Sequence, residues 1–201
     1  MIKAITFDLD GVYFINGKSA FIANLVNMGV LESEAKRVFL QSDEMNNQYK
    51  LGRLDDVQFW SWAAREWNLN KTPDELIKLL VSGYEVDQEV LNIVKSVRSK
   101  GYKTLICSNN FPARINGLQN RFGFLNDFDA WALSYEVGFA KPSPEIFNNL
   151  IEKSGVSASE IVFSDDNEAN IEAGAKLGIN TFYYQGFNDF LDKLTELGVK
   201  K

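Results

Sequence analysis

The stretch ITFDLDGVYF, residues 5–14, begins with an apolar run and then places two carboxylates, Asp8 and Asp10, two residues apart. A short run of β-branched and aromatic residues is typical of a buried strand. Two acids at the end of such a strand need a physical reason, because both are charged at neutral pH and repel each other.

Four more short apolar runs are predicted to be buried strands, and helical patterns separate the later ones. The five predicted strands cover residues 3–8, 103–108, 130–134, 160–164 and 180–184, and the helical patterns cover residues 112–122, 144–153 and 168–177. Strands that alternate with helices form parallel sheets covered on both faces. The sequence therefore predicts an α/β fold with a Rossmann-like, doubly wound parallel sheet of about five strands.

Residues 19–83 interrupt this alternation, because they contain only helical periodicity. We expect them to form an inserted helical cap subdomain, and residues 1–18 and 84–201 to form the α/β core. The capping-box pattern Thr72-Pro73-Asp74-Glu75 marks one helix start inside the insertion.

Aromatic and small residues of the insertion recur at helical spacing. Because Val57, Trp60, Ala64 and Trp67 show this spacing, the two tryptophans are predicted to pack the interior of the cap, and direct stacking on a substrate is the alternative. Just before the insertion, the dipeptide Asn16-Gly17 predicts a tight hairpin.

Composition narrows the possible functions. The chain has 201 residues, 21 basic and 27 acidic side chains and a net charge of −6, which disfavours a nucleic-acid partner. One cysteine excludes an intramolecular disulfide, and no run of about 18 apolar residues suggests a membrane span. We expect a cytoplasmic protein with no membrane partner, and nothing in the sequence indicates an oligomeric state. The absence of histidine excludes Ser-His-Asp and Cys-His catalysis and the usual catalytic zinc sites.

Polar side chains follow three of the predicted strands where each one ends. The first strand is followed by Asp8 and Asp10, the second ends at Ser108, and the fourth is followed by Asp165 and Asp166. In a parallel sheet these ends meet at one edge, where ligands bind. Turn and helix-cap roles are the alternative explanation for each cluster alone. Acids gathered at successive strand ends instead favour a hard divalent cation such as Mg²⁺.

Four motifs carry a family resemblance. FDLDGV (residues 7–12), CSNN (107–110), KPSPEIF (141–147) and VFSDDNEANIEAGAKLGI (162–179) together resemble the haloacid dehalogenase superfamily, in order and across nearly the whole chain. Within it, the chain resembles members with a small helical cap after the first motif. The segment YKLGRLDDVQFW (49–60) is similar to small sugar-phosphate phosphatases of that group.

The resemblance implies roles for the two opening acids. Asp8 matches the nucleophile, which forms a phosphoaspartate with the substrate and so divides one displacement into two. Asp10 matches the general acid and base, which protonates the leaving alkoxide and later takes a proton from water. A chain without histidine can manage both proton transfers in this way.

The resemblance also implies phosphate and metal ligands. Ser108 and the amide of Asn109 would bind the phosphate, and Lys141 would neutralise its charge. Asp8, the backbone carbonyl of Asp10, and Asp166 would hold Mg²⁺. Asp165 would orient a metal-bound water from outside, although the reverse assignment of Asp165 and Asp166 stays open.

The function that follows is a Mg²⁺-dependent phosphatase acting on a small phosphomonoester, such as a sugar phosphate, through a phosphoaspartate. The alternatives are a phosphomutase of the same family, a 2-haloacid dehalogenase and a non-catalytic binding module. Dehalogenases lack an acid at the position of Asp10, because no alkoxide needs a proton, and a binding module has no need of the intact set of motif residues.

Several other polar residues belong to the predicted cap or to the helix after the second strand. Solvated surface positions are expected for Asp43, Glu44, Asn46, Gln48, Lys50, Arg53 and Arg114. Cys107 lies inside an apolar run and is expected to be a buried structural residue, since no obvious cationic neighbour would lower the pKa of its thiol.

Overall fold

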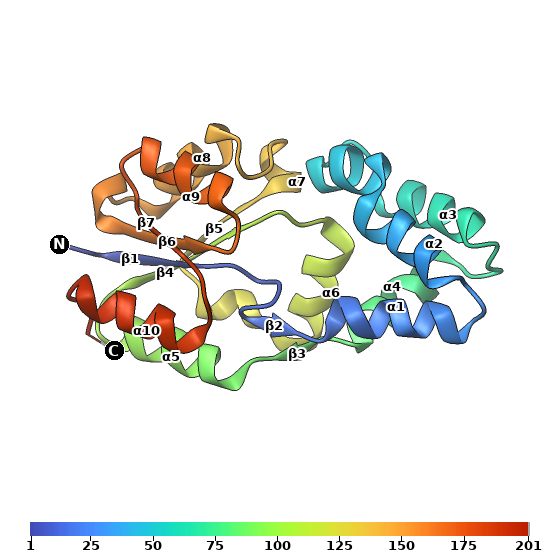
Figure 1. Ribbon diagram of the computed structural model, residues 1–201, viewed down its shortest axis with the longest axis horizontal. Coiled ribbons are helices and arrows are strands. Elements are labelled where there is room, and N and C mark those ends of the chain that lie inside the picture. Colours follow the sequence, from blue (N-terminus) through green and yellow to red (C-terminus); the bar gives the residue numbers. More distant parts are fainter. Residues whose placement is uncertain (201) are drawn as a thin grey trace.

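Five parallel strands form the central sheet of the structure, a computed structural model that describes residues 1–200 (Figure 1). Their order across the sheet is β5–β4–β1–β6–β7. The strands are β1 (Ala4–Phe7), β4 (Lys103–Ser108), β5 (Ala130–Leu133), β6 (Ile161–Asp165) and β7 (Asn180–Tyr183). This arrangement confirms the predicted α/β class and strand number.

Strand β1 lies in the middle of the sheet, hydrogen-bonded to β4 on one side and β6 on the other. Its four residues are at most 1% exposed, as expected for a central strand covered on both faces. Figure 1 shows helices on both faces of the sheet. On one face lie α8 (Pro144–Ser154) and α9 (Glu168–Lys176), and on the other α5 (Gln88–Ser99) and α10 (Phe187–Glu196).

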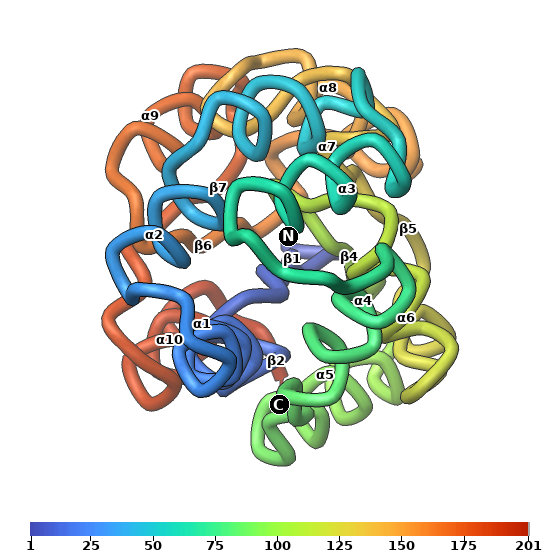
Figure 2. Tube along the Cα trace, turned by 90° about the vertical axis from the view of Figure 1, so that its right-hand side faces the viewer, coloured from blue at the N-terminus to red at the C-terminus, as the bar shows by residue number. Residues whose placement is uncertain are grey.

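The remaining helices gather beyond the carboxyl ends of the strands (Figure 1). Four of them follow the first strand: α1 (Gly17–Asn27), α2 (Glu32–Lys36), α3 (Asp56–Glu66) and α4 (Pro73–Ser82). Short π-helical and 3₁₀ turns connect α2 to α3, at Arg37–Gln41, Glu44–Gln48 and Tyr49–Leu51. Seen end-on in Figure 2, this helical part lies in front of the sheet. The division of the chain at residues 19–83 stays a prediction.

Two elements of the core lie against these helices. Helix α6 (Pro112–Phe122) contacts α4, and the short helix α7 (Ser134–Val137) contacts the turn Tyr49–Leu51. The helical part therefore packs against the rest of the chain at both α6 and α7.

The aromatic interior of the helical part is continuous with the core. Trp60 is fully buried and packs against Phe21, Phe39 and Phe111, the last of which lies just before α6. Trp67 is also buried, so the predicted packing of the two tryptophans is confirmed. Ala64 is buried as well, whereas Val57 is 64% exposed, because it lies on the outer face of α3.

The predicted hairpin at Asn16-Gly17 is not formed. Strand β2 (Phe14–Ile15) pairs antiparallel with β3 (Glu85–Val86), far along the chain. Asn16 adopts a left-handed conformation with φ of 66° and precedes α1 instead. At Gly17 a Cβ atom would lie 2.3 Å from the ring of Tyr84, so only glycine allows this approach. The paired strands fasten the start and end of the helical part to each other.

Candidate active site

A cavity of about 120 Å³ lies at the carboxyl ends of β1 and β6. It is lined by Asp8, Asp10, Gly11, Val12, Ser164, Asp165, Asp166 and Tyr184. The structure therefore brings all four acids singled out in the sequence to one cavity. Parallel strands cause this convergence, because β1 and β6 run in the same direction and end at the same edge.

Lys141 links the acids of the two strands. Its buried ammonium lies 2.6 Å from Asp165 Oδ2 and 3.7 Å from Asp8 Oδ1. Burial alone would lower the pKa of Lys141, but the negative charges of Asp8 and Asp165 outweigh it and raise the pKa above its usual range. Lys141 is therefore positively charged at neutral pH and offsets the repulsion between the two strand ends.

Asp165 and Asp166 have very different surroundings. Asp165 is buried: Oδ1 accepts hydrogen bonds from the N–H of Asn167 and Nδ2 of Asn170, and Oδ2 accepts one from Lys141. Asp166 is exposed, and its carboxylate accepts no hydrogen bond within residues 1–200. Asp165 is thus already satisfied by protein donors, whereas Asp166 is free to bind a ligand.

The two predicted phosphate contacts on β4 are also placed differently. Ser108 is buried at the end of the strand, where its hydroxyl accepts a hydrogen bond of 3.4 Å from Asn110 Nδ2. The side chain of Asn109 bonds the backbone of Lys141 twice, donating to its carbonyl at 3.0 Å and accepting from its N–H at 2.7 Å. Asn109 therefore fixes the loop that carries Lys141, and its backbone N–H is the group left for a ligand.

The carboxylate of Asp10 faces different partners from that of Asp8. Its Oδ2 lies 2.5 Å from Arg114 Nη1 and 2.9 Å from Lys18 Nζ, and its Oδ1 accepts a hydrogen bond of 3.4 Å from the hydroxyl of Tyr84. Burial by itself would raise the pKa of Asp10, but Arg114 and Lys18 lower it below its usual value. Asp10 is therefore ionised in this arrangement.

The expectation that Arg114 is a solvated surface residue is wrong. Arg114 is 1% exposed, and its guanidinium lies over the ring of Phe111 at 4.9 Å. Its Nε donates to Asn110 Oδ1 and its Nη1 to the hydroxyl of Tyr84. Arg114 lies on the inner face of α6, so the ion pair with Asp10 and the ring contact compensate for its burial.

Lys18 and Tyr84 were not identified from the sequence. Lys18 lies in the first turn of α1 and Tyr84 just before β3, and no local pattern distinguishes them from surface or core residues. The pairing of β2 with β3 brings both close to Asp10. A search for cations within reach of the second acid would have found Lys18, the first lysine that follows it along the chain.

The polar stretch between α2 and α3 is only partly solvated. Asp43 and Arg53 are exposed, as expected, whereas Glu44, Asn46, Gln48 and Lys50 are half-buried. Cys107 is fully buried, as predicted, and burial raises the pKa of its thiol to about 12. The thiol is therefore neutral and unsuited to act as a nucleophile.

The oxygen atoms around the cavity fit a magnesium ion. Asp8 Oδ2, the backbone carbonyl of Asp10 and the carboxylate of Asp166 accept no hydrogen bond within residues 1–200. No group of three or more acidic, cysteine or histidine side chains is preassembled for a metal in that part of the chain. Two carboxylates and a carbonyl suit Mg²⁺, which usually binds one or two carboxylates and keeps waters or phosphate oxygens in its other positions.

Comparison with known proteins defines the class. A model of the haloacid dehalogenase-like hydrolases matches residues 2–178, so the chain belongs to this family of hydrolytic enzymes. Among residues 1–200, no helix is both long and apolar enough to cross a membrane.

Two similar proteins match this chain over nearly their full length. A D-ribitol-5-phosphate phosphatase from Bacteroides thetaiotaomicron is 28% identical over 205 residues, covering 97% of this chain and 98% of that protein. The crystal structure of a HAD family enzyme from the same organism has a TM-score of 0.81 at 24% identity, covering 96% of this chain and 98% of that one. A complex of that enzyme with magnesium and inorganic phosphate has a TM-score of 0.77 at 24% identity, covering 92% and 95% of the two chains.

Proposed function

We propose that the protein is a magnesium-dependent phosphatase that hydrolyses a small phosphomonoester, such as a sugar or polyol phosphate, through a phosphoaspartate. The observation that carries this proposal is the pair of acids at the end of β1. Asp8 has a free carboxylate oxygen beside a buried cation, Lys141, and Asp10 lines the same cavity with separate partners. The relative that acts on D-ribitol 5-phosphate and the magnesium and phosphate complex of the similar enzyme support it.

In the first step, Asp8 Oδ2 forms a bond to phosphorus while the bond between phosphorus and the leaving oxygen breaks. Lys141 offsets the negative charge on the phosphoryl group and on Asp8. Asp10 takes up a proton when the substrate binds and donates it to the leaving oxygen, so that the leaving group departs as an alcohol. The approach of a phosphate dianion raises the pKa of Asp10, because like charges disfavour its ionised form.

In the second step, water attacks the phosphorus of the phosphoaspartate and releases Asp8. Asp10 takes a proton from this water, and the ion pairs with Arg114 and Lys18 favour the carboxylate form that accepts it. Asp10 thus regains in the second step the proton that it gave to the leaving oxygen in the first.

Asp8, Asp166 and the backbone carbonyl of Asp10 would hold Mg²⁺, which supplies positive charge to the phosphoryl oxygens. Asp165 keeps Lys141 in place and is itself held by Asn170, so we assign it a supporting role. The hydroxyl of Ser108 and the N–H of Asn109 would bind the phosphate. A phosphorylated metabolite as substrate also agrees with a cytoplasmic location.

The test is direct detection of the intermediate. Purified protein should release phosphate from phosphomonoesters in Mg²⁺ and stop in EDTA. Rapid-quench reactions of Asp10→Asn with an aryl phosphate should show a burst of leaving group and a hydroxylamine-sensitive acyl phosphate. Asp8→Asn should show neither. Full activity in Asp8→Asn, or unchanged activity in chelator with no metal recovered on the protein, would refute the proposal.

A further inference from the structure

Three cations gather around Asp10: Lys18, Lys50 and Arg114, called here the cation cluster. Lys18 and Arg114 contact the carboxylate directly, at 2.9 Å and 2.5 Å. Lys50 belongs to the turn Tyr49–Leu51, and the ring of Tyr49 stacks at 4.9 Å on Phe111, the ring that the guanidinium of Arg114 also contacts. Three positive charges thus face one carboxylate, which leaves an uncompensated positive charge beside the proposed active site.

Lys50 shows this surplus most clearly. It is half-buried, and its ammonium donates to the side-chain oxygen of Asn46 at 2.9 Å, with no carboxylate in contact within residues 1–200. Burial and the charges of Arg114 and Lys18 lower the pKa of Lys50 to about 8. A lysine held among other cations destabilises the folded protein, so its position needs another reason.

Arg114 provides an independent observation. Its Nη2 is buried and has no hydrogen-bond partner within residues 1–200, although the other donors of its guanidinium are engaged. Buried arginine donors are nearly always satisfied by an acceptor. A donor without an acceptor next to an uncompensated lysine indicates that a ligand supplies the missing negative group.

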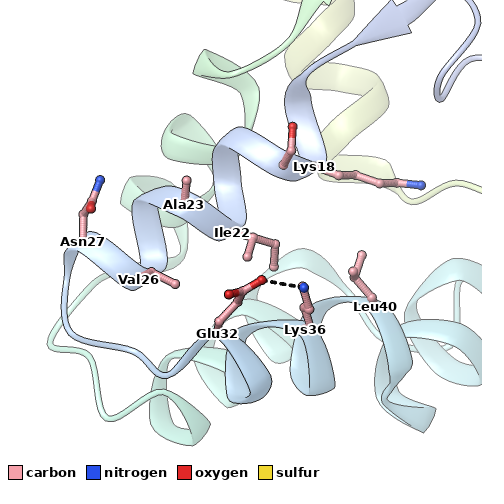
Figure 3. A pocket seen from close by; sticks show the side chains of 9 residues that line it. Lys18, Ile22, Ala23, Val26, Asn27, Glu32, Lys36 and Leu40 are labelled. Carbon is pink, nitrogen blue, oxygen red and sulfur yellow. Dashed lines mark ion pairs between the residues drawn. The ribbon is translucent and has the colours of Figure 1, made fainter.

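Lys18, one member of the cation cluster, lines a cavity next to Asp10. This second cavity, of about 350 Å³, adjoins the acid cavity and shares Asp10 and Gly11 with it; Lys18 and Tyr84 also line it. In Figure 3 the amine of Lys18 points away from the apolar groove between α1 and α2, and its ion pair places it at Asp10. Asp10 protonates the leaving oxygen, so the group beyond that oxygen enters this cationic space.

We propose that the leaving group of the substrate carries an anionic substituent, a carboxylate or a second phosphate, that binds Lys50, Lys18 and the free Nη2 of Arg114. This inference rests on the proposed function, because it takes Asp8 as the phosphoryl acceptor. The substrate class is then a phosphorylated sugar acid or a bisphosphate. A neutral polyol phosphate would leave the cation cluster without its counter-charge.

Binding can be measured without turnover in the Asp8→Asn variant with Mg²⁺ present. Three ligands share one carbon skeleton: D-ribitol 5-phosphate, D-ribonate 5-phosphate and D-ribitol 1,5-bisphosphate. Calorimetry should show that at least one of the two ligands with a second anion binds about tenfold or more tightly than ribitol phosphate, the size expected for one charged hydrogen bond. Tighter binding of ribonate phosphate alone would identify a carboxylate site. Tighter binding of the bisphosphate alone would identify a second phosphate site.

Variants in the same background identify the residues. Lys50→Met should remove the preference, and Lys50→Arg should keep it. Lys36→Met is the matched control: Lys36 is also a lysine of the helical part, but it is paired with Glu32 in the groove of Figure 3 and should not affect the preference.

Equal affinities of the Asp8→Asn protein for all three ligands would overturn the proposal. A loss of affinity in Lys50→Met that is equal for neutral and anionic ligands would also overturn it. The cation cluster would then serve Asp10 alone. Hydrolysis of p-nitrophenyl phosphate separates this result from failure of the proposed function. An intact binding preference without any hydrolysis would refute the phosphatase and leave the anion site standing.

Discussion

Asp8 and Asp10 are two residues apart in the chain, yet the structure surrounds them with different parts of the molecule. The partners of Asp8 are Lys141 and the N–H of Leu9, and both belong to the α/β core. The partners of Asp10 are Lys18 at the start of α1, Tyr84 before β3, and Arg114 on α6. Asp8 is therefore surrounded by residues that adjoin the sheet, whereas Asp10 lies between the sheet and the helices that follow β2.

The two acids themselves give the largest expected difference. Asp8→Asn should lower kcat by about 10⁴-fold or more with every substrate, because the amide does not attack phosphorus. Asp10→Asn should lower the rate of alkyl phosphates by about 10²–10⁴-fold and slow the release of leaving group from aryl phosphates less. Single-turnover rates with both substrate types measure the difference, and thermal unfolding controls for folding. Equal losses in Asp10→Asn for both types would remove its role as an acid.

The buried cations Lys141 and Arg114 are expected to affect alkyl and aryl phosphates differently. Lys141→Met should lower kcat/KM by about 10²–10³-fold for alkyl and aryl phosphates alike, because it removes charge stabilisation at phosphorus. Arg114→Met should affect alkyl phosphates more, because it disturbs Asp10 and the leaving-group side. Steady-state kinetics with the two substrate types test this, and the unfolding midpoint of each variant separates misfolding from catalysis. An opposite pattern of selectivity would exchange the two roles.

The adjacent acids Asp165 and Asp166 are expected to differ in their effect on Mg²⁺ binding and on stability. Asp166→Ala should weaken Mg²⁺ binding about tenfold or more, since it removes a free carboxylate. Asp165→Ala should weaken it less and destabilise the fold by roughly 3–5 kcal/mol, because it removes the close ion-pair partner of buried Lys141. Calorimetric Mg²⁺ titration and urea denaturation of both variants measure the two effects. Stronger loss of Mg²⁺ binding in Asp165→Ala would reverse the assignment.

The smallest effect is expected on the stability of the protein, from Lys50 in the turn Tyr49–Leu51. The pKa of Lys50 is lowered to about 8, so the unfolded chain binds more protons than the folded protein above that value, and stability rises with pH from about 8 toward 10. Below pH 8 the charged lysine costs stability. Lys50→Met should therefore stabilise the protein at pH 7 by roughly 1–3 kcal/mol, after allowance for partial exposure.

Denaturant unfolding at pH 7 and pH 9 tests this expectation. Lys36→Met serves as the control, because Lys36 is paired with Glu32 on the surface and should give no gain. A destabilised Lys50→Met at pH 7 would show that the lysine contributes to the fold and is not held there at a cost.

Predictions were correct for features that depend only on residues adjacent in the sequence. The helix predicted over residues 112–122 is α6 at the same bounds, and the capping box at Thr72 is formed with Glu75. The hairpin at Asn16-Gly17 failed because strand pairing is decided by the partner strand, and β3 lies at the far end of the helical part. The solvated position expected for Arg114 failed because charge alone does not show which face of α6 is covered.

Hydrophobic periodicity in the sequence predicts the strands, their alternation with helices and the acids that follow β1 and β6, because periodicity is a local property. In a parallel sheet the ends of these strands then lie at the same edge. Only the tertiary structure decided which cations each acid receives. Lys141 reaches Asp8 and Asp165 from the loop between α7 and α8. Lys18 and Arg114 meet at Asp10 through the pairing of β2 with β3 and the packing of α6. Electrostatic partners depend on distance in space, and their order along the chain does not record it.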